Sequence, residues 1–292
     1  MINKVAGVIA VWLLLLLAFV RSEAQIAQQP LHLYVASEAN DTMGVFDEEG
    51  TRQPTDAGSF YGLDGAMGMT YDSANGWIYV AQNGPNTVSA YDRNGNRQAL
   101  TGTFPNLDFP ISIAYDSADG LLYVVSHSSD TVTAYEANGN QRLLPGRFPN
   151  LHEPYGITYD ADNHLLYVTN ADGTINAYDQ KGRRHPLHGA FADLRAPCGI
   201  TYDPSNHLLY VADQASNTVT AYNADGFEQR LRKHFANLDE PYNIAYDGAN
   251  HLLYVTSVGN NSVSAYDENG EQQVLPRAFD GLDEPTGIVA AP

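Results

Sequence analysis

One unit of about 44 residues occurs six times along this chain of 292 residues. A Tyr-Val pair marks each copy, and its tyrosines are Tyr34, Tyr79, Tyr123, Tyr167, Tyr210 and Tyr254, spaced by 45, 44, 44, 43 and 44 residues. Repeats of this length are typical of β-propeller blades and of helical HEAT or armadillo arrays. The residue types inside the unit therefore decide between a β and a helical architecture.

The unit has the composition of short strands. Its apolar stretches are rich in Tyr, Val, Ile and Thr, are bounded by turns such as Asn-Gly, Asp-Gly and Asn-His, and show no sustained 3.6-residue period. In the fourth copy, residues 156–160, 165–170 and 174–179 predict three strands, and a weaker fourth strand runs toward Phe191. We therefore predict an all-β fold, a six-bladed β-propeller with four antiparallel strands per blade.

The two ends of the repeat region complement each other. Residues 31–35 have a second-strand sequence with no first strand before them, whereas residues 285–289 have a first-strand sequence. We expect the C-terminal strand to become the innermost strand of the N-terminal blade, because this closure leaves no unpaired inner edge.

Residues 1–24 have the sequence of a targeting segment. Lys4 precedes sixteen uncharged, mostly aliphatic residues, 5–20, and Ser22-Glu23-Ala24 fits a signal peptidase site. A retained membrane anchor is the alternative, but the apolar run is shorter than the roughly 18 to 20 residues that span a bilayer. We predict a cleaved signal peptide followed by a single propeller domain over residues 25–292. The mature protein is expected to be secreted or periplasmic and monomeric, with no stable membrane span.

The repeat explains most tyrosines and many aspartates. Sixteen of the 19 tyrosines occupy three repeat positions and are interpreted as blade core: beside the six named above, these are Tyr71, Tyr115, Tyr159, Tyr202, Tyr246, Tyr91, Tyr135, Tyr178, Tyr222 and Tyr266. Aspartates that follow these tyrosines, such as Asp160 and Asp179, are expected to close turns by accepting backbone N–H bonds. The lone Cys198 has no partner for an intrachain disulfide and is expected to be a small buried side chain.

The chain carries 34 acidic against 15 basic residues, for a formal net charge of -19. This balance argues against a nucleic-acid partner, because phosphates would be repelled. Thirteen carboxylates fall in the connections expected on one face: Asp64, Asp108, Glu153, Asp193, Asp239, Glu240, Asp283, Glu284, Glu38, Asp41, Asp130, Asp172 and Asp213. Arg195 alone opposes them there. Such an acidic face favours a divalent cation, a cationic small molecule or a basic protein surface, and the alternative is a solvated surface that only confers solubility.

A few polar residues near the expected axial mouth do not follow the repeat pattern. His127 and His152 occupy neighbouring connections, and Glu153 beside His152 would allow a general acid/base pair. Tyr155 and Tyr242 follow prolines at the start of innermost strands. The candidate ligand-binding set is His127, His152, Glu153, Tyr155, Asp213, Tyr242 and Asn243. By contrast, His164, His207 and His251 recur in the Asn-His turn and are interpreted as turn residues on the opposite face.

The segments Pro154-Tyr155-Gly156-Ile157-Thr158-Tyr159-Asp160 and Leu165-Leu166-Tyr167-Val168-Thr169-Asn170 resemble the repeats of NHL and YVTN-type β-propellers, and the likeness covers residues 31–290. These families include adhesive and protein-binding scaffolds, surface-layer proteins, lactonases of the gluconolactonase type and lyases, so the resemblance implies an architecture rather than one function. Similarity to the gluconolactonase type implies a divalent cation such as Ca²⁺ at the axial mouth. The candidate ligands, chosen by location, are Glu153, Asn170, Asp213 and Asn243.

Two functional hypotheses follow. The first is a non-enzymatic exported binding module that presents its acidic face to a protein, a glycan or a cationic ligand. The second is a divalent-metal-assisted hydrolase or lyase of the gluconolactonase type, in which the metal polarises a carbonyl or activates a water. The uniformity of the repeats favours the first hypothesis, because few polar residues intrude where a catalytic cluster would be assembled.

Overall fold

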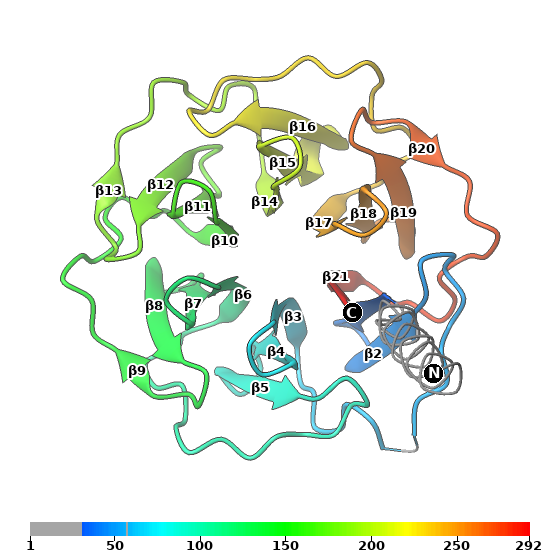
Figure 1. Ribbon diagram of the computed structural model, residues 1–292, viewed down its shortest axis with the longest axis horizontal. Coiled ribbons are helices and arrows are strands. Elements are labelled where there is room, and N and C mark those ends of the chain that lie inside the picture. The colour runs from blue at the N-terminus through cyan, green and yellow to red at the C-terminus, as the bar shows by residue number, and fades with distance from the viewer. Residues whose placement is uncertain (1–30, 57) are drawn as a thin grey trace, which may run out of the picture. The chain divides into compact units, whose positions relative to one another are not determined.

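The computed structural model describes residues 31–56 and 58–292, and within them His32–Ala291 form one compact unit. Six antiparallel sheets stand around a common axis (Figure 1), which confirms the predicted six-bladed β-propeller. The predicted signal peptide, residues 1–24, lies outside the described residues. In the described part of the chain, no helix has both the length and the apolar character needed to cross a bilayer.

Each blade places one seven-residue strand next to the axis. These innermost strands are β3 (Ala66–Asp72), β6 (Pro110–Asp116), β10 (Pro154–Asp160), β14 (Pro197–Asp203), β17 (Pro241–Asp247) and β21 (Pro285–Ala291). The second strands are β1 (His32–Ser37), β4 (Trp77–Gln82), β7 (Leu121–Ser126), β11 (Leu165–Asn170), β15 (Leu208–Asp213) and β18 (Leu252–Ser257). The third strands are β2 (Thr42–Phe46), β5 (Thr87–Tyr91), β8 (Thr131–Glu136), β12 (Ile175–Asp179), β16 (Thr218–Asn223) and β19 (Ser262–Asp267). A short 3-10 turn, η1 (Gln214–Ser216), follows β15.

The outermost strand of each blade is very short. Three blades have a two-residue fourth strand, namely β9 (Gln141–Arg142), β13 (Arg184–His185) and β20 (Gln272–Gln273). In the other three blades the fourth strand is reduced to the isolated bridges Phe46↔Arg52, Tyr91↔Arg97 and Tyr222↔Glu228. The chain thus leaves the third strand almost at once, and part of the outer edge of each third strand remains open.

The ring closes as the sequence predicts. β21 pairs antiparallel with β1 from His32↔Ala291 to Val35↔Ile288, and β1 in turn pairs with β2. The C-terminal strand is therefore the innermost strand of the N-terminal blade, and it contacts the neighbouring innermost strands β3 and β17.

The second strands are buried between neighbouring blades. Every side chain of β7 and of β11 is buried, as expected for a strand that has other blades packed on both faces. Their sequences are accordingly apolar at successive positions rather than alternating with polar residues, which is why the Tyr-Val segments stand out in each repeat.

The tyrosines of the Tyr-Val pairs join adjacent blades. Each ring is at most 1% exposed, and each hydroxyl donates a hydrogen bond to a backbone carbonyl in the turn after the third strand of the next blade. The six bonds, of 2.8 to 3.2 Å, run from Tyr34 to Arg93, Tyr79 to Ala137, Tyr123 to Gln180, Tyr167 to Ala224, Tyr210 to Glu268 and Tyr254 to Glu48. The same contact therefore crosses every blade interface, including the one that closes the ring.

The third-strand tyrosines anchor the connection that precedes their own blade. Each hydroxyl donates a hydrogen bond to a backbone carbonyl of that connection. The five bonds run from Tyr91 to Tyr61, Tyr135 to Pro105, Tyr178 to Pro149, Tyr222 to Ala192 and Tyr266 to Ala236. In the N-terminal blade Phe46 takes this place without a hydroxyl and packs on Phe279, with 5.0 Å between ring centroids. Both sets of tyrosines are blade core, as predicted.

The first-strand tyrosines are the more exposed members of the predicted core. Tyr71, Tyr115, Tyr159 and Tyr246 are half-buried, and Tyr202 alone of this set is buried at 7% exposure. All five pack against or belong to the buried clusters, so they form the edge of the core, as predicted.

Deletion of residues 284–292 should lower the melting temperature by at least about 10 °C, because loss of burial on the order of 5 kcal/mol is expected when β21 is removed. Thermal unfolding followed by circular dichroism measures this change. Removal of Pro292 alone, which lies beyond β21, is the control. An unchanged melting temperature in the longer deletion would contradict closure by β21.

Tyr167→Phe should lower the free energy of unfolding by about 1 to 3 kcal/mol, because the carbonyl of Ala224 loses its donor inside a packed interface. Tyr254→Phe should cost a similar amount, since it removes the same bond at the closing interface. Urea denaturation measures both values. Tyr61→Phe, at a side chain that is 59% exposed, is the control and should leave stability unchanged. Equal stability of all three variants would show that the interface bonds contribute nothing.

Candidate functional site

The turns between second and third strands meet the inter-blade connections on one face of the propeller. The Gly65 N–H donates to Asp41 Oδ1 at 2.6 Å, and the Glu240 N–H donates to Asn217 Oδ1 at 2.7 Å. Both bonds link a turn of one blade to the start of the innermost strand of the next. Of the thirteen carboxylates predicted in these segments, Asp213 is buried, Glu38 is half-buried and the other eleven are exposed. Arg195 is exposed as well.

Two of the candidate site residues hold the backbone of a connection. Asp213 accepts hydrogen bonds from the N–H groups of Arg195 (2.8 Å) and Ala196 (2.9 Å) and from the Ser216 hydroxyl (2.8 Å). Asn170 accepts from the His152 N–H at 3.0 Å. The equivalent second-strand ends hold their connections in the same way, through Ser37, Gln82, Ser126 and Ser257. The side chains of Asn170 and Asp213 therefore have a structural role, because their hydrogen bonds hold the backbone of these connections.

The mouth of the channel on this face is closed by apolar groups. Ile111, Tyr155, Cys198 and Tyr242 surround a space of about 10 Å³, which is the volume one water needs. Tyr155 and Tyr242 also pack against a buried cluster that includes Met67 and Ile111. A small-molecule substrate of ordinary size finds no room there, since ligand pockets typically measure about 300 to 1,000 Å³.

Some of the predicted site residues meet and others do not. The rings of His127 and Tyr155 are 4.8 Å apart, and His127 Nδ1 lies 3.3 Å from the carbonyl of Pro154. Tyr155, Tyr242 and Asn243 line the same small mouth. His152 is exposed and lines a groove on the outer side of β12, and in the described part of the chain no contact joins it to His127. The structure thus brings His127, but not His152, beside Tyr155.

Asn243 bridges two innermost strands. Its amide nitrogen donates to the carbonyl of Thr286 at 3.2 Å, and its Oδ1 accepts from the Ile244 N–H at 2.8 Å. Four other blades have glycine here, and at Gly156 an added Cβ would lie 2.2 Å from the carbonyl oxygen of Cys198. The innermost strands therefore approach closely, and Asn243 fits by spanning to its neighbour.

The four residues proposed for a divalent cation do not fit a shared site. Asn170 and Asp213 are bonded to separate connections, and Asn243 is bonded to the next innermost strand. The Glu153 N–H donates to Asp130, and its carboxylate is exposed on the surface. Within residues 31–56 and 58–292, no three His, Cys, Asp or Glu side chains converge in a way that could hold a metal ion.

Cys198 has the properties of a buried apolar side chain. It is 3% exposed, and burial, assisted by the charge of Asp213, raises the pKa of its thiol to about 12. The thiol is therefore protonated near neutral pH and a poor nucleophile. Burial likewise raises the pKa of the Tyr242 hydroxyl well above its ordinary value.

The opposite end of the channel carries a set of polar residues that the sequence reasoning did not connect. His164, His207 and His251 lie in the turn after the innermost strand with positive φ angles of 55°, 61° and 56°, as the turn prediction requires. Each ring also lies beside the hydroxyl of the tyrosine five residues earlier: Tyr159 with His164 at 2.9 Å, Tyr202 with His207 at 3.2 Å and Tyr246 with His251 at 2.9 Å. The signal in the sequence is the spacing Tyr-Asp-x-x-Asn-His, which occurs three times.

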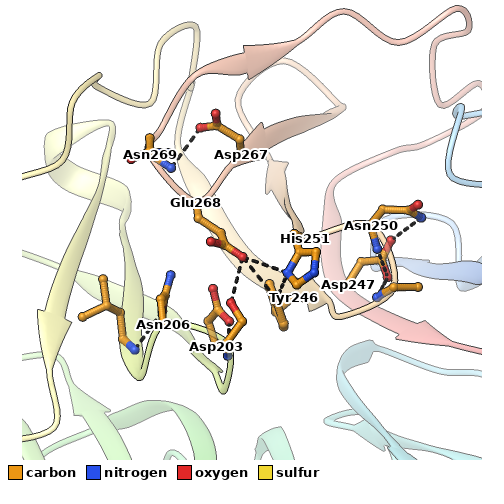
Figure 2. A network of polar contacts seen from close by, with 12 residues as sticks. Asp203, Asn206, Tyr246, Asp247, Asn250, His251, Asp267, Glu268 and Asn269 are labelled. Atoms are coloured by element: carbon orange, nitrogen blue, oxygen red, sulfur yellow. Dashed lines mark hydrogen bonds and ion pairs between the residues drawn. The ribbon is translucent and has the colours of Figure 1, made fainter.

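A carboxylate completes two of these pairs. Asp162 accepts from the Tyr202 hydroxyl and lies 2.7 Å from His207 Nδ1. Glu268, from the turn after β19, lies 3.3 Å from the Tyr246 hydroxyl and 3.1 Å from His251 Nδ1, as Figure 2 shows. The third pair has an amide instead, since Gln180 Nε2 donates to the Tyr159 hydroxyl at 3.2 Å. The Asp162 contacts join neighbouring blades, whereas Glu268 and Gln180 contact residues of their own blade.

The aspartates before these turns act as predicted. Oδ1 of Asp72, Asp116, Asp160, Asp203 and Asp247 accepts the N–H of the residue two positions on. Oδ2 of Asp160 and Asp247 is bonded to Asn163 and Asn250, but Asn206 turns instead to the Tyr210 hydroxyl. Asp203 Oδ2 is consequently buried without a hydrogen-bond partner among the described residues.

Tyr202→Phe should raise the pKa of Asp162 toward its ordinary value. The Tyr202 hydroxyl and then the His207 ring hydrogen-bond the charged carboxylate and hold its pKa below that value. The stability contributed by this depressed pKa is present above the unfolded-state pKa and is lost as the pH falls through the folded-state pKa. Carboxyl-carbon NMR titration measures the change, with Tyr246→Phe in the neighbouring blade as control. If the pKa of Asp162 is unchanged in Tyr202→Phe, the Tyr202 hydroxyl is not what lowers it.

No protein-family model matches this sequence, and no curated protein matches it. Solved structures match over most of the chain. A chain of the nidogen/laminin complex is 18% identical with a TM-score of 0.72, covering 90% of this chain and 98% of that chain. Virginiamycin B lyase from Staphylococcus aureus is 19% identical with a TM-score of 0.58, covering 87% and 83%. A protein of unknown function from Desulfotomaculum acetoxidans is 13% identical with a TM-score of 0.65, covering 89% and 98%.

At these identities the likeness shows the fold alone. The six-bladed β-propeller is shared with a chain of a binding complex and with a lyase, so the architecture is compatible with either role. The narrower resemblance to NHL and YVTN-type repeats is not confirmed by these comparisons.

Proposed function

We propose that this protein is an exported, non-catalytic binding module that uses an acidic rim to hold a basic segment of a partner protein. The acidic rim consists of the exposed carboxylates of the connections and of the turns after the second strands: Asp41, Asp64, Asp108, Asp130, Glu153, Asp172, Asp193, Asp239, Glu240, Asp283 and Glu284. Arg195 is the basic residue among them. A rim of one charge sign attracts a partner of opposite sign and orients its approach.

The closed mouth is the observation that carries this proposal. The space of about 10 Å³ that the described residues Ile111, Tyr155, Cys198 and Tyr242 leave between them is too small for a cationic small molecule. The exposed carboxylates surrounding it are available to a surface that docks from outside. A neutral glycan would leave this charge unmatched, whereas a basic protein segment neutralises it. The chain of the nidogen/laminin complex offers a precedent for a propeller of this fold in a protein assembly.

The alternative of a metal-assisted hydrolase or lyase lacks comparable support. Asn170 and Asp213 are engaged with separate connections, and Asn243 is engaged with Thr286. The likeness to virginiamycin B lyase extends to the fold, and its identity of 19% carries no residue roles to this chain. The binding module is therefore the function that the geometry supports better.

A variant with Asp239→Asn, Glu240→Gln, Asp283→Asn and Glu284→Gln should bind a dodecalysine peptide at least about tenfold more weakly than the unaltered protein, a change of roughly 1.4 kcal/mol. These four residues are adjacent pairs on neighbouring connections of the rim. Isothermal titration calorimetry at two salt concentrations measures the affinity, which should fall as salt rises.

The control variant removes the same charge elsewhere. Glu49→Gln, Asp119→Asn, Glu228→Gln and Glu271→Gln neutralise four exposed carboxylates that are not part of the rim. This variant should keep most of the affinity. If both variants lose affinity equally, the attraction belongs to the net charge of -19 rather than to the rim, and the proposal fails.

A further inference from the structure

The outer edge of β16 is open in its first half, around Val219. β16 is the last strand of a three-stranded sheet, in the order β14-β15-β16, and its outer side meets the rest of the chain at the isolated bridge Tyr222↔Glu228. There the Gln229 N–H donates to the carbonyl of Ala221 at 2.8 Å. Beyond Gln229 the chain leaves the strand, and an open strand edge of this kind can accept a further strand.

The backbone of Val219 faces this open side. In an antiparallel strand the N–H and C=O of one residue point to the same side, and residues two apart repeat that direction. Ala221 points outward because its carbonyl accepts from Gln229, and so does Asn223, whose N–H donates to the carbonyl of Phe227 at 3.0 Å. Val219 therefore presents both an N–H and a carbonyl to the open side of β16.

A groove runs along this edge. It has a volume of about 490 Å³, with Thr218, Val219, Thr220 and Ala221 on one side and residues 228–235 on the other. The far wall is held in place because the Lys233 N–H donates to the carbonyl of Asn269 in the next blade at 3.0 Å. The groove is thus a formed space between the strand edge and a fixed segment.

The far wall is basic, although the chain as a whole is acidic. Arg230, Arg232 and Lys233 are exposed, and in the described part of the chain none of them takes part in an ion pair. His234 follows them, and Glu228 is the carboxylate among the lining residues. Three cations within four residues, against one carboxylate in the same lining, give this wall a local positive charge in a protein of net charge -19.

The corresponding groove of another blade does not have this excess of basic residues. Along β12 it measures about 350 Å³, and its lining has Asp172 opposite Arg184 and His185. Arg184 is also bonded to the Asn176 side chain at 3.2 Å. The basic wall therefore distinguishes the β16 groove from the β12 groove.

We propose that the β16 groove binds an extended acidic peptide segment of a partner protein, which adds to the sheet as a fourth strand. The Val219 N–H and carbonyl would pair with the peptide backbone, and its carboxylates would meet Arg230, Arg232 and Lys233. Strand addition supplies backbone hydrogen bonds, while the charges select an acidic sequence. The unused backbone groups favour a peptide over a sulfated polyanion, because a polyanion has no donors and acceptors spaced to match a strand.

The probe is a ten-residue peptide of alternating Glu and Thr, titrated calorimetrically into the full protein. Arg232→Ser with Lys233→Ser should weaken its binding at least tenfold. Lys181→Ser with Arg183→Ser, which removes the same charge from exposed positions on another blade, should not. Circular dichroism confirms that both variants are folded. Equal affinity of the two variants would overturn the proposal.

Strand pairing is tested separately from charge. The same peptide with N-methylated backbone amides along one edge keeps its carboxylates but cannot form the ladder, and it should bind at least tenfold more weakly. Hydrogen exchange at the Val219 amide should slow when the unmodified peptide binds. If the methylated peptide or a sulfated oligosaccharide binds as well and Val219 exchange is unchanged, the groove is a polyanion patch and the proposal is wrong. Dimerisation of the free protein that is lost in Arg232→Ser with Lys233→Ser would instead assign the groove to a second copy.

Discussion

The ring depends on one hydrogen bond that is made six times, from a buried second-strand tyrosine to a backbone carbonyl of the next blade. At each interface the aromatic ring is buried between two sheets, and the hydroxyl donates to a backbone carbonyl in a partly buried bond. A buried carbonyl without a donor would destabilise the interface, so the bond fixes how one blade lies against the next. The bond from Tyr254 to Glu48 repeats this contact at the closure, which makes the last interface equivalent to the other five.

Polar side chains near the axis, which could otherwise suggest a catalytic centre, form hydrogen bonds within the scaffold. Asp213 and Asn170 hold connections, Asn243 joins two innermost strands, and the aspartates after the innermost strands close turns. A closed ring has many backbone N–H and C=O groups near its axis that need hydrogen-bond partners, and these side chains provide them. The small space at the mouth is lined mainly by apolar and aromatic side chains, and the exposed charges lie on the rim and at the outer blade edges.

The acidic rim and the β16 groove carry opposite charge. The acidic rim follows from carboxylates placed in segments that the fold brings together, whereas the β16 groove combines an open strand edge with the cations Arg230, Arg232 and Lys233. Very short fourth strands create the open edge, because the chain pairs for one or two residues and then turns to the next blade. A repeat fold can in this way offer different partners different parts of one module.

The sequence by itself determined the six blades, the closure and the turn aspartates, because period, strand-forming composition and turn residues are local properties that recur in every unit. It placed Tyr71, Tyr115, Tyr159 and Tyr246 in the core correctly but could not show that they are only half-buried there, since their exposure depends on how distant strands pack. It also could not tell that His127 meets Tyr155 while His152 faces outward, or that Tyr246 and His251 share Glu268. Those contacts were decided by the tertiary structure, because they join residues from different strands and blades whose direction no single repeat specifies.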